Sequence, residues 1–249
     1  MIPQDPGVRS RRRRWLARTA VGLVVVLVAA LVGVVVAYPV AVAAACPTCY
    51  GFQRAGSDLY VDDSATPDQR RQAVEMIAAA RQRVDEFYGD TRSSPRVLVC
   101  LSDDCYGHLG GGEKGQTLRD LVVALSPAGA NVVIASHELA HAEQYHRLGS
   151  RFDQVPHWFN EGLAVLISDD PRYLTAKPAG DRCPIDYAQA LTAIRAGTAP
   201  PPDAAQDFYR NSACVVDRWA ATHGGAVAVH DLIRRLLTGE PFTDIVVPA

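Results

Sequence analysis

The stretch from Asn131 to Gly149 constrains this chain most, because it combines a helix with two histidines spaced for one metal ion. Its sequence, NVVIASHELAHAEQYHRLG, contains no proline; Asn131 can cap the first turn and Gly149 follows the last. His137 and His141 are four positions apart, so both imidazoles lie on one face of the helix and can reach one ion. Glu138 is turned about 100° from His137, within reach of a water on that ion.

A second segment offers a third ligand. Residues 156–164 read PHWFNEGLA, and Pro156 suits the first turn of a new helix. Glu161 lies 20 residues after His141, far enough for a second helix to fold back beside the first. Catalytic zinc sites use three protein ligands and leave one position open, and two histidines with one glutamate are such a set. We therefore predict that His137, His141 and Glu161 bind Zn²⁺.

Two other histidines are weaker candidates for the third ligand. His146 lies five positions after His141 on the same helix and points about 140° away from it. His157 stands beside Trp158, where a histidine more often packs against its neighbours or supports a ligand than binds the metal itself. The sequence leaves these roles for His157 open.

The two motifs together resemble those of a known family. HELAH followed by PHWFNEGLA is similar to the gluzincin metallopeptidases, in particular the peptidase MA-like families, whose second motif reads Pro-x-Trp-x-x-Glu-Gly-x-Ala. The resemblance runs from about Leu59 to the C-terminus. It implies that His137, His141 and Glu161 bind zinc and that Glu138 is the general base of peptide hydrolysis.

The chain departs from the thermolysin pattern at one position. Thermolysin-type enzymes place an acidic residue four positions after the glutamate ligand, where it orients the first histidine, and Val165 stands there in this chain. Asp169, Asp170 and Glu143 are alternative sources of that contact.

Tyr209 is a second candidate catalytic residue. It begins the sequence YRNS, which resembles a Tyr-x-x-Ser stretch of the same families. The resemblance implies that the Tyr209 hydroxyl donates a hydrogen bond to the developing oxyanion. A tyrosine that only packs the C-terminal helix explains the same residue equally well.

The N-terminal region differs from the rest of the chain. Residues 1–18 contain six arginines and one acidic residue, and residues 19–45 contain no charged side chain. Trp15 and Tyr38 bracket an apolar run long enough to cross a bilayer as a helix. Because the arginines precede the run, the N-terminus is expected in the cytoplasm. We predict a cytoplasmic basic tail, a transmembrane signal anchor at residues 19–45 and a single-pass protein of the cell membrane.

Other export signals fit this region less well. A cleaved signal peptide has an apolar core of about 7–15 residues, which is shorter than this run. Residues 12–16, RRRWL, faintly resemble a twin-arginine signal, but the valine-rich run is unusually hydrophobic for one. Residues 43–46, AAAC, faintly resemble a signal-peptidase site or lipobox without the usual leucine.

The cysteines support an exported domain. All six follow the apolar run, at positions 46, 49, 100, 105, 183 and 214. An even number of cysteines on the exported side predicts disulfides rather than zinc thiolates. Six cysteines allow 15 pairings, and the sequence does not select among them.

The exported part is acidic. The chain has 25 basic and 27 acidic residues, and its first 45 residues hold six of the former and one of the latter, which leaves a net charge of −7. Without a basic patch beyond the N-terminal tail, nucleic acid is not an expected partner. The expected partners are a peptide or protein substrate and, through the N-terminal helix, the membrane.

For residues 59–249 we predict an α+β fold, after a juxtamembrane linker at residues 46–58. A small mixed sheet covers the zinc-binding helix, and a mostly helical C-terminal half supplies Glu161. In enzymes that the chain resembles, an edge strand before the zinc helix pairs with the extended substrate. The expected segments are strands at 59–61, 96–101 and 118–125, helices at 66–88, 131–149, 156–167, 184–196, 208–222 and 226–237, and a Gly-rich loop at 102–116.

The function that follows is a membrane-anchored, exported zinc metallopeptidase with Glu138 as general base. The alternative is a metallopeptidase-like module that binds zinc but turns over little, and that acts as a binding or structural protein at the cell surface. The presence of Glu138 argues against this alternative, whereas Val165 argues weakly for it.

Overall fold

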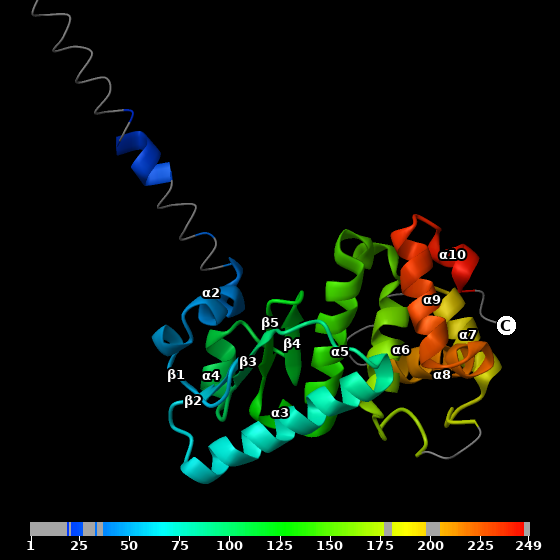
Figure 1. Cartoon of the computed structure of the whole chain (residues 1–249), viewed down its shortest axis with the longest axis horizontal. Helices are drawn as coiled ribbons and strands as arrows, with labels where there is room; N and C mark the ends of the chain where they lie inside the picture. Colours follow the sequence, from blue (N-terminus) through cyan, green and yellow to red (C-terminus); the bar gives the residue numbers. More distant parts are fainter. Residues whose placement is uncertain are drawn as a thin grey trace, which may run out of the picture.

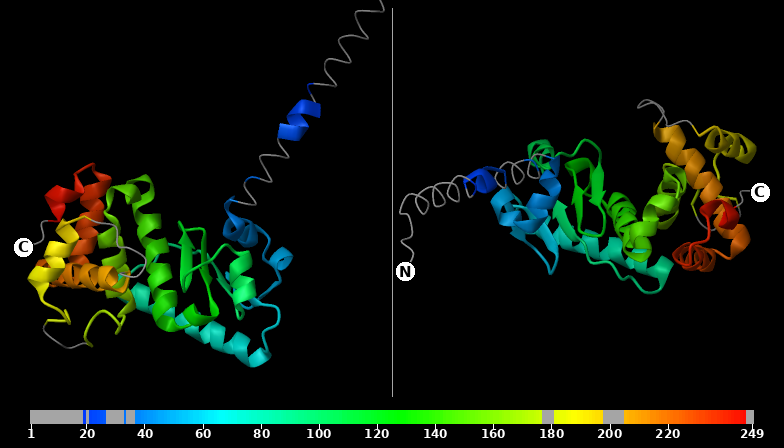
Figure 2. Two further views of the ribbon diagram at one scale, coloured as in Figure 1. Left: turned by 180° about the vertical axis from the view of Figure 1, so that it is seen from behind. Right: turned by 90° about the horizontal axis from the view of Figure 1, so that it is seen from above.

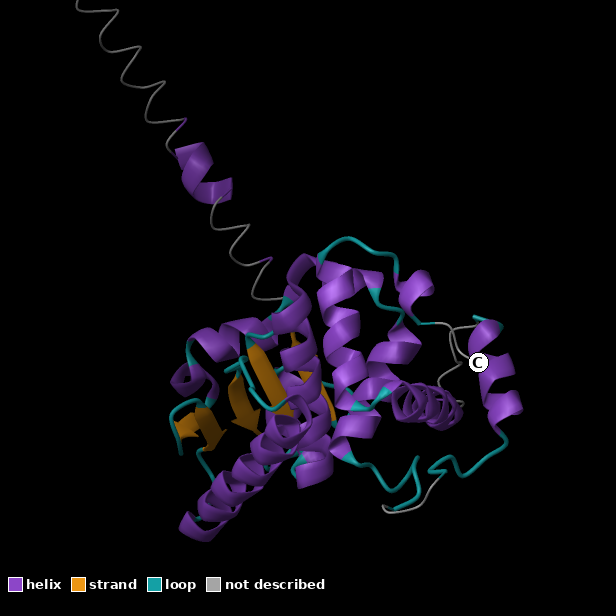
Figure 3. Cartoon of the chain, turned by 45° about the vertical axis from the view of Figure 1, so that its right-hand side comes forward, coloured by secondary structure: helices purple, strands orange, loops and turns teal. Residues whose placement is uncertain are grey.

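A small five-stranded sheet and the helices that cover it lie on one side of the described chain, and a group of C-terminal helices lies on the other (Figures 1 and 3). The computed structural model describes residues 19, 21–26, 33, 37–176, 181–197 and 205–246. The strands are β1 (Phe52–Arg54), β2 (Leu59–Asp62), β3 (Arg96–Val99), β4 (Gly115–Leu118) and β5 (Val122–Leu125). The helices are α2 (Pro39–Ala45), α3 (Pro67–Tyr88), α4 (Asp103–His108), α5 (Val132–Leu148), α6 (His157–Ser168), α7 (Tyr187–Arg195), α8 (Ala205–His223), α9 (Ala226–Leu237) and α10 (Phe242–Ile245), with short 3₁₀ helices η1 (Pro47–Tyr50), η2 (Pro127–Gly129) and η3 (Gly149–Gln154).

The sheet is mixed, with the order β1-β2-β3-β5-β4. β2, β3 and β5 run parallel, and the edge strands β1 and β4 pair antiparallel with their neighbours. The central strands β3 (RVLV) and β5 (VVAL) are apolar almost throughout, as expected of parallel strands that are covered on both faces. Alternate side chains divide between the two faces: Leu98, Val122 and Ala124 face α2 and α4, and Val97, Val99, Val123 and Leu125 face α3 and α5.

Local signals set the ends of the two long helices on the second face. Thr66 and Gln69 form a capping box at the start of α3, and Gly89 ends it with φ 72°. The Asn131 side chain accepts a hydrogen bond of 3.0 Å from the Ile134 N–H and so caps α5. The predicted boundaries of both helices are confirmed to within one residue.

The helical half is built on α6, which packs between α5 and α8. Figure 2 shows α8 and α9 on the side of α6 that faces away from the sheet. The approach of α6 to α8 is close at Gly162, where an added Cβ would lie 2.6 Å from Val216 Cγ2 and even nearer to the Ser212 carbonyl oxygen. No larger residue fits here without moving one helix, so Gly162 fixes the distance between α6 and α8.

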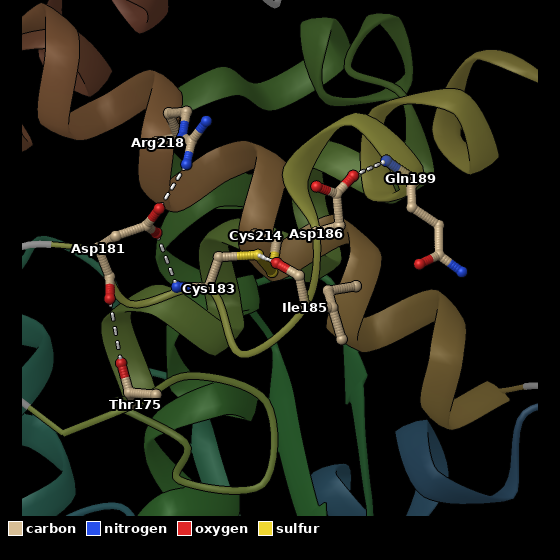
Figure 4. The surroundings of a disulfide bond; sticks show 8 residues. All are labelled: Thr175, Asp181, Cys183, Ile185, Asp186, Gln189, Cys214 and Arg218. Carbon is tan, nitrogen blue, oxygen red and sulfur yellow. Dashed lines mark hydrogen bonds and ion pairs between the residues drawn. A yellow bond between two sulfur atoms is a disulfide. The ribbon is translucent and has the colours of Figure 1, made fainter.

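The six cysteines form three disulfides: Cys46–Cys49, Cys100–Cys105 and Cys183–Cys214. The prediction of disulfides is therefore confirmed, and the structure supplies the pairing that the sequence left open. Figure 4 shows the Cys183–Cys214 bond, which ties the segment before α7 to α8. Beside it, Asp181 accepts a hydrogen bond of 3.0 Å from the Cys183 N–H and forms an ion pair with Arg218.

The small mixed sheet is present as predicted, but the predicted fold class needs correction, because the described chain as a whole is mainly helical and no transmembrane helix is found within it. None of the helices formed by described residues is both long and apolar enough to cross a membrane. Part of the predicted anchor at residues 19–45, and the whole tail at residues 1–18, lie outside the described residues.

The end of the predicted anchor shows why the prediction fails there. Residues 39–45 form α2, whose Val40, Ala43 and Ala44 are buried against the sheet, and the Ala44 carbonyl accepts a hydrogen bond from Arg96. These apolar residues belong to the folded domain rather than to a lipid-facing helix. The single-pass cell-membrane localisation is therefore wrong on the described residues, whereas the three disulfides fit an extracellular location.

Two further segments differ from expectation. The strand predicted at 118–125 is a hairpin, since β4 ends at Leu118, and β5 is a central strand while β4 is the edge. Arg119, Asp120 and Leu121 make the turn between them. The loop predicted at 102–116 contains α4, capped by Ser102, and the first residues of β4. Within the predicted linker at 46–58, β1 pairs with β2 as part of the sheet.

Replacing Gly162 with alanine should destabilise the protein. The clash with Ser212 and Val216 costs about 1–3 kcal/mol, which exceeds the gain of at most about 1 kcal/mol in helix propensity. Gly107→Ala in α4 is the matched control, because an added Cβ there meets nothing within 4 Å. Thermal unfolding should show a lower Tm for Gly162→Ala and an unchanged or higher Tm for Gly107→Ala. Equal Tm values for both variants would contradict this account of the contact between α6 and α8.

Candidate metal centre

Three predicted ligands meet at the contact between α5 and α6. His137 Nε2 lies 3.0 Å from His141 Nε2 and 3.2 Å from Glu161 Oε2, and His141 Nε2 lies 3.5 Å from the same oxygen. Among the described residues, these side chains form a group that could hold a metal ion, with one ligand atom each and all such atoms within 4.8 Å. The three are largely buried, with His141 slightly more exposed than the other two.

The spacing of the three ligand atoms fits a tetrahedral ion. Ligand atoms about 2.1 Å from such an ion lie about 3.4 Å apart along the edges of the tetrahedron. The three observed separations, between 3.0 and 3.5 Å, bracket that value. Two neutral imidazoles and one carboxylate are also donors suited to a divalent transition metal. The residues present therefore fit a metal with three protein ligands.

Each ligand is placed by its helix. The two histidines project from successive turns of α5, as the four-residue spacing requires, and Glu161 projects from the first half of α6. The second carboxylate oxygen, Glu161 Oε1, lies 3.5 Å from His157 Nδ1, one turn earlier on α6. The His157 ring stacks on Phe208 of α8 with centroids 5.2 Å apart. His157 thus borders Glu161 as a neighbour, while His146 pairs with Asp120 at 2.9 Å, away from the cluster.

Electrostatic interactions favour a negatively charged Glu161 and a positively charged His141 in the cluster. Burial alone would raise the pKa of Glu161, but His141 and His137 outweigh it and hold that pKa well below its usual range. Burial likewise lowers the pKa of His141, yet the charge and hydrogen bond of Glu161 outweigh it, so the net shift from 6.5 is upward. The negative charge of Glu161 therefore favours a positive charge beside it, either a proton on His141 or a bound metal ion.

Glu138 lies beside the cluster and is held by β4. Its Oε2 accepts a hydrogen bond of 2.6 Å from the Thr117 hydroxyl, which also lies 3.0 Å from the Glu138 carbonyl oxygen. An added Cβ at Gly115 would lie 2.6 Å from Glu138 Cγ, so a larger residue here would displace the Glu138 side chain from its observed position. Sequence reasoning missed Thr117 and Gly115, because their role depends on the pairing of β4 with β5 and on its packing against α5.

Tyr209 also borders the cluster. It projects from α8, its ring centroid lies 6.1 Å from that of His137, and it stacks on Tyr173 at 5.5 Å. Burial, together with the charge of Glu161, raises the pKa of Tyr209, so its hydroxyl keeps its proton and can donate a hydrogen bond.

The three carboxylates considered as orienting partners of the histidines lie elsewhere. The fully buried Glu143 accepts hydrogen bonds from the Ser93 N–H at 2.7 Å and from Arg147 Nε at 2.6 Å. Asp169 pairs with Arg182, and Asp170 pairs with Arg172. All three serve the packing of loops against helices rather than the orientation of His137 or His141.

The cluster opens into a cleft of about 730 Å³ between the sheet and the helical half. One wall is β4 with the hairpin turn that follows it, and the other walls come from α5, η3, α6 and Tyr209. The lining includes all three candidate ligands, Glu138 and Tyr209. The predicted site residues therefore face one cavity that is large enough for several residues of a peptide.

Comparison with known proteins adds no relative: no protein-family model, curated protein or solved structure matches this chain. The resemblance to peptidase MA-like enzymes stays a prediction that depends on two short motifs and on the residues placed around them.

The folded protein should bind about one divalent metal ion per chain through this cluster. His137→Ala combined with His141→Ala should abolish that binding, whereas His146→Ala on the same helix should not, because His146 lies outside the group. Metal content after dialysis against zinc, measured by mass spectrometry, distinguishes the two variants. Full metal occupancy in the double variant would refute the site.

Metal affinity should also depend on pH in a defined direction. The ion binds neutral imidazole, so a proton on His141 competes with it. Because the pKa of His141 is raised above 6.5, affinity should fall as the pH drops through that raised value and level off above it. Calorimetric titration with zinc across pH 5.5 to 8.5 tests this, with proton release on binding as the second observable. An affinity that is constant over this range would contradict the assignment of His141 as a ligand.

Proposed function

We propose that this protein is a zinc-dependent metallopeptidase that hydrolyses peptide bonds in the cleft beside α5. One observation carries the proposal: three ligand atoms with tetrahedral spacing share a cleft with a carboxylate, Glu138, that is not among them. A purely structural metal site would be closed by four ligands, whereas three ligands at an open cleft leave a position for water or substrate.

Zinc is the metal that this donor set suits best. Two histidine nitrogens and one carboxylate oxygen at tetrahedral spacing are a ligand set of hydrolytic zinc enzymes, whereas Mg²⁺ and Ca²⁺ prefer oxygen ligands in larger number. When bound, zinc supplies Lewis acidity, which polarises a carbonyl group and lowers the pKa of water.

Three residues of the chain have separate roles in the proposed hydrolysis. Glu138 takes the proton from the attacking water and delivers it to the nitrogen of the leaving amine. Thr117 holds the Glu138 carboxylate from the side of β4 through its hydrogen bond of 2.6 Å. Tyr209 keeps its proton and donates it in a hydrogen bond to the oxygen that gains charge as the carbonyl carbon becomes tetrahedral.

The edge strand β4 supports a peptide as the substrate. β4 pairs with β5 on one side only, so the backbone groups along its other edge are available to an extended chain. Gly115, Thr117 and Leu118 of this strand line the cleft beside Glu138. Main-chain pairing with such an edge binds a peptide without reference to its sequence, and it brings one peptide bond of the substrate next to the metal ligands.

Glu138→Gln should separate catalysis from metal binding. Glutamine has nearly the shape of glutamate and can keep the contact with Thr117, but it cannot accept a proton from water. Zinc content and Tm should therefore remain, while cleavage of a diverse peptide library should fall by about 10²–10⁴-fold. Glu161→Gln is the contrasting variant, because it removes a charged ligand and should weaken zinc binding as well as cleavage.

Two outcomes would overturn the proposal. If the zinc-loaded wild type cleaves nothing in the library, the protein is a metal-binding module of the kind considered in the sequence analysis. If the wild type cleaves and Glu138→Gln is equally active, the hydrolytic site lies elsewhere in the chain.

Tyr209→Phe tests the role of the hydroxyl alone. Phenylalanine keeps the stacking on Tyr173 but removes the hydrogen-bond donor. The expected result is a fall in kcat of about 10²–10³-fold with little change in KM, since the bond forms mainly in the transition state. Tyr173→Phe is the control, because it changes the partner ring of the stack instead. Equal kcat values for Tyr209→Phe and wild type would leave Tyr209 with a packing role.

A further inference from the structure

Arg119 occupies an unusual position at the end of the edge strand. It is the first of the three residues between β4 and β5, and the Leu121 N–H donates a hydrogen bond of 3.2 Å to the Leu118 carbonyl across Arg119 and Asp120. Its φ is 55°, in the left-handed region that residues with a side chain seldom adopt. The long arginine side chain is thus carried by a turn conformation that glycine or asparagine would adopt at lower cost.

Contacts with α5 hold this turn in place. Asp120 Oδ2 lies 2.9 Å from His146 Nδ1, and the guanidinium carbon of Arg119 lies 5.4 Å from the centre of the Tyr145 ring. Tyr145 in turn packs against Phe152 of η3, with ring centroids 5.3 Å apart. The charged end of Arg119 is therefore set over an aromatic ring that belongs to the cleft wall.

Arg119 has no carboxylate partner among the described residues. Three arginines elsewhere in the described chain are paired with carboxylates: Arg147 with Glu143, Arg172 with Asp170, and Arg182 with Asp169. Arg119 lines the same cleft as Glu138 and the candidate ligands. Its guanidinium group lies over the Tyr145 ring rather than against a carboxylate. Asp153 also lines the cleft but forms no ion pair with Arg119 there. The cleft thus presents a guanidinium group that lies over an aromatic ring and has no carboxylate partner within the part of the chain that the structure describes.

The strand sets how far this cation lies from the reacting bond. On the proposed function the bond to be cleaved lies near Glu138, and therefore near Thr117, which contacts Glu138. Arg119 follows two residues later, in the turn just past the end of β4, so its backbone lies at most about 7 Å from that of Thr117, the span of two extended residues. A peptide paired with β4 would bring a side chain two or three residues from the cleaved bond next to the Arg119 guanidinium.

We propose that Arg119 forms a subsite for a carboxylate, and that the protein selects peptides with an acidic group two or three residues from the cleaved bond. This inference rests on the function proposed above, because it uses the same cleft and the same edge strand. The recognised group is a carboxylate, which either an aspartate or glutamate side chain or the C-terminus of a short peptide supplies; guanidinium binds both in the same bidentate way.

Cleavage of matched peptide libraries tests the subsite. Random-sequence peptides are digested by the full-length, zinc-loaded protein in two forms, with a free and with an amidated C-terminus, and the cleavage sites are read by mass spectrometry. Wild type should favour Glu over Gln on the order of tenfold at one position, two or three residues from the cleaved bond. Loss of cleavage in the amidated library alone would assign the carboxylate to the C-terminus.

The variants show whether Arg119 is responsible. Arg119→Gln should remove the preference for Glu, and Arg119→Lys should keep part of it, because lysine retains the charge without the planar fork. Arg234→Gln changes the net charge equally at an exposed position of α9 and should leave the preference intact. Tm values for all three variants show that the fold is kept. An unchanged preference in Arg119→Gln, or cleavage by wild type without any acidic preference, overturns the inference.

A binding measurement separates this inference from the proposed hydrolysis. The zinc-loaded Glu138→Gln protein is immobilised, and the retention of uncleaved library peptides is compared with that on Glu138→Gln, Arg119→Gln. Acidic peptides should be retained by the first and about tenfold less by the second. Retention that depends on Arg119, together with a zinc-loaded wild type that cleaves nothing, would keep the subsite and refute the peptidase. Equal retention by both proteins would refute the subsite, whatever the cleavage result.

Discussion

The close packing of α6 against both α5 and α8 is the constraint on which the site depends. Glu161 reaches the two histidines of α5 only because α6 runs alongside α5, and the next residue, Gly162, lets α8 approach another side of the same helix. The metal-ligand candidate and the glycine at the helix contact are therefore neighbours in the sequence, turned about 100° from each other around one helix. A helix held from both sides cannot shift its carboxylate, which fixes the ligand geometry before any ion binds.

Buried charged groups also hold α5, the helix that carries the two histidines, in one position. Glu143, with no exposed surface, accepts hydrogen bonds from the Arg92 and Ser93 N–H groups and from Arg147, whose guanidinium carbon lies 4.5 Å from the centre of the Tyr88 ring. This network joins α5 to the loop between α3 and β3. Such a buried carboxylate is costly unless every lone pair is used, so its satisfied contacts define one position for α5 against the sheet.

Sequence reasoning succeeded where the signal was local. The helix expected at 66–88 is found at Pro67–Tyr88, Asn131 caps α5 as expected, and the spacing of His137 and His141 implied a shared face. It failed where apolar residues had two possible environments. Residues 39–45 are as apolar as a membrane span, but they cover the sheet as α2, and hydropathy alone does not distinguish burial in protein from burial in lipid. The hairpin at Arg119 was missed because a turn with a non-glycine residue at positive φ leaves no signature in composition.

The sequence by itself determined which side chains could share a metal ion and which carboxylate stood beside them, because a helix of fixed pitch converts the spacing in HELAH into a direction in space. Only the tertiary structure decided the contacts between elements that are distant in the chain. The pairing of Thr117 with Glu138, the placement of Arg119 over Tyr145 and the choice of partners for six cysteines depend on how the sheet and helices pack together. Such contacts arise from packing of the whole chain, so no local pattern encodes them.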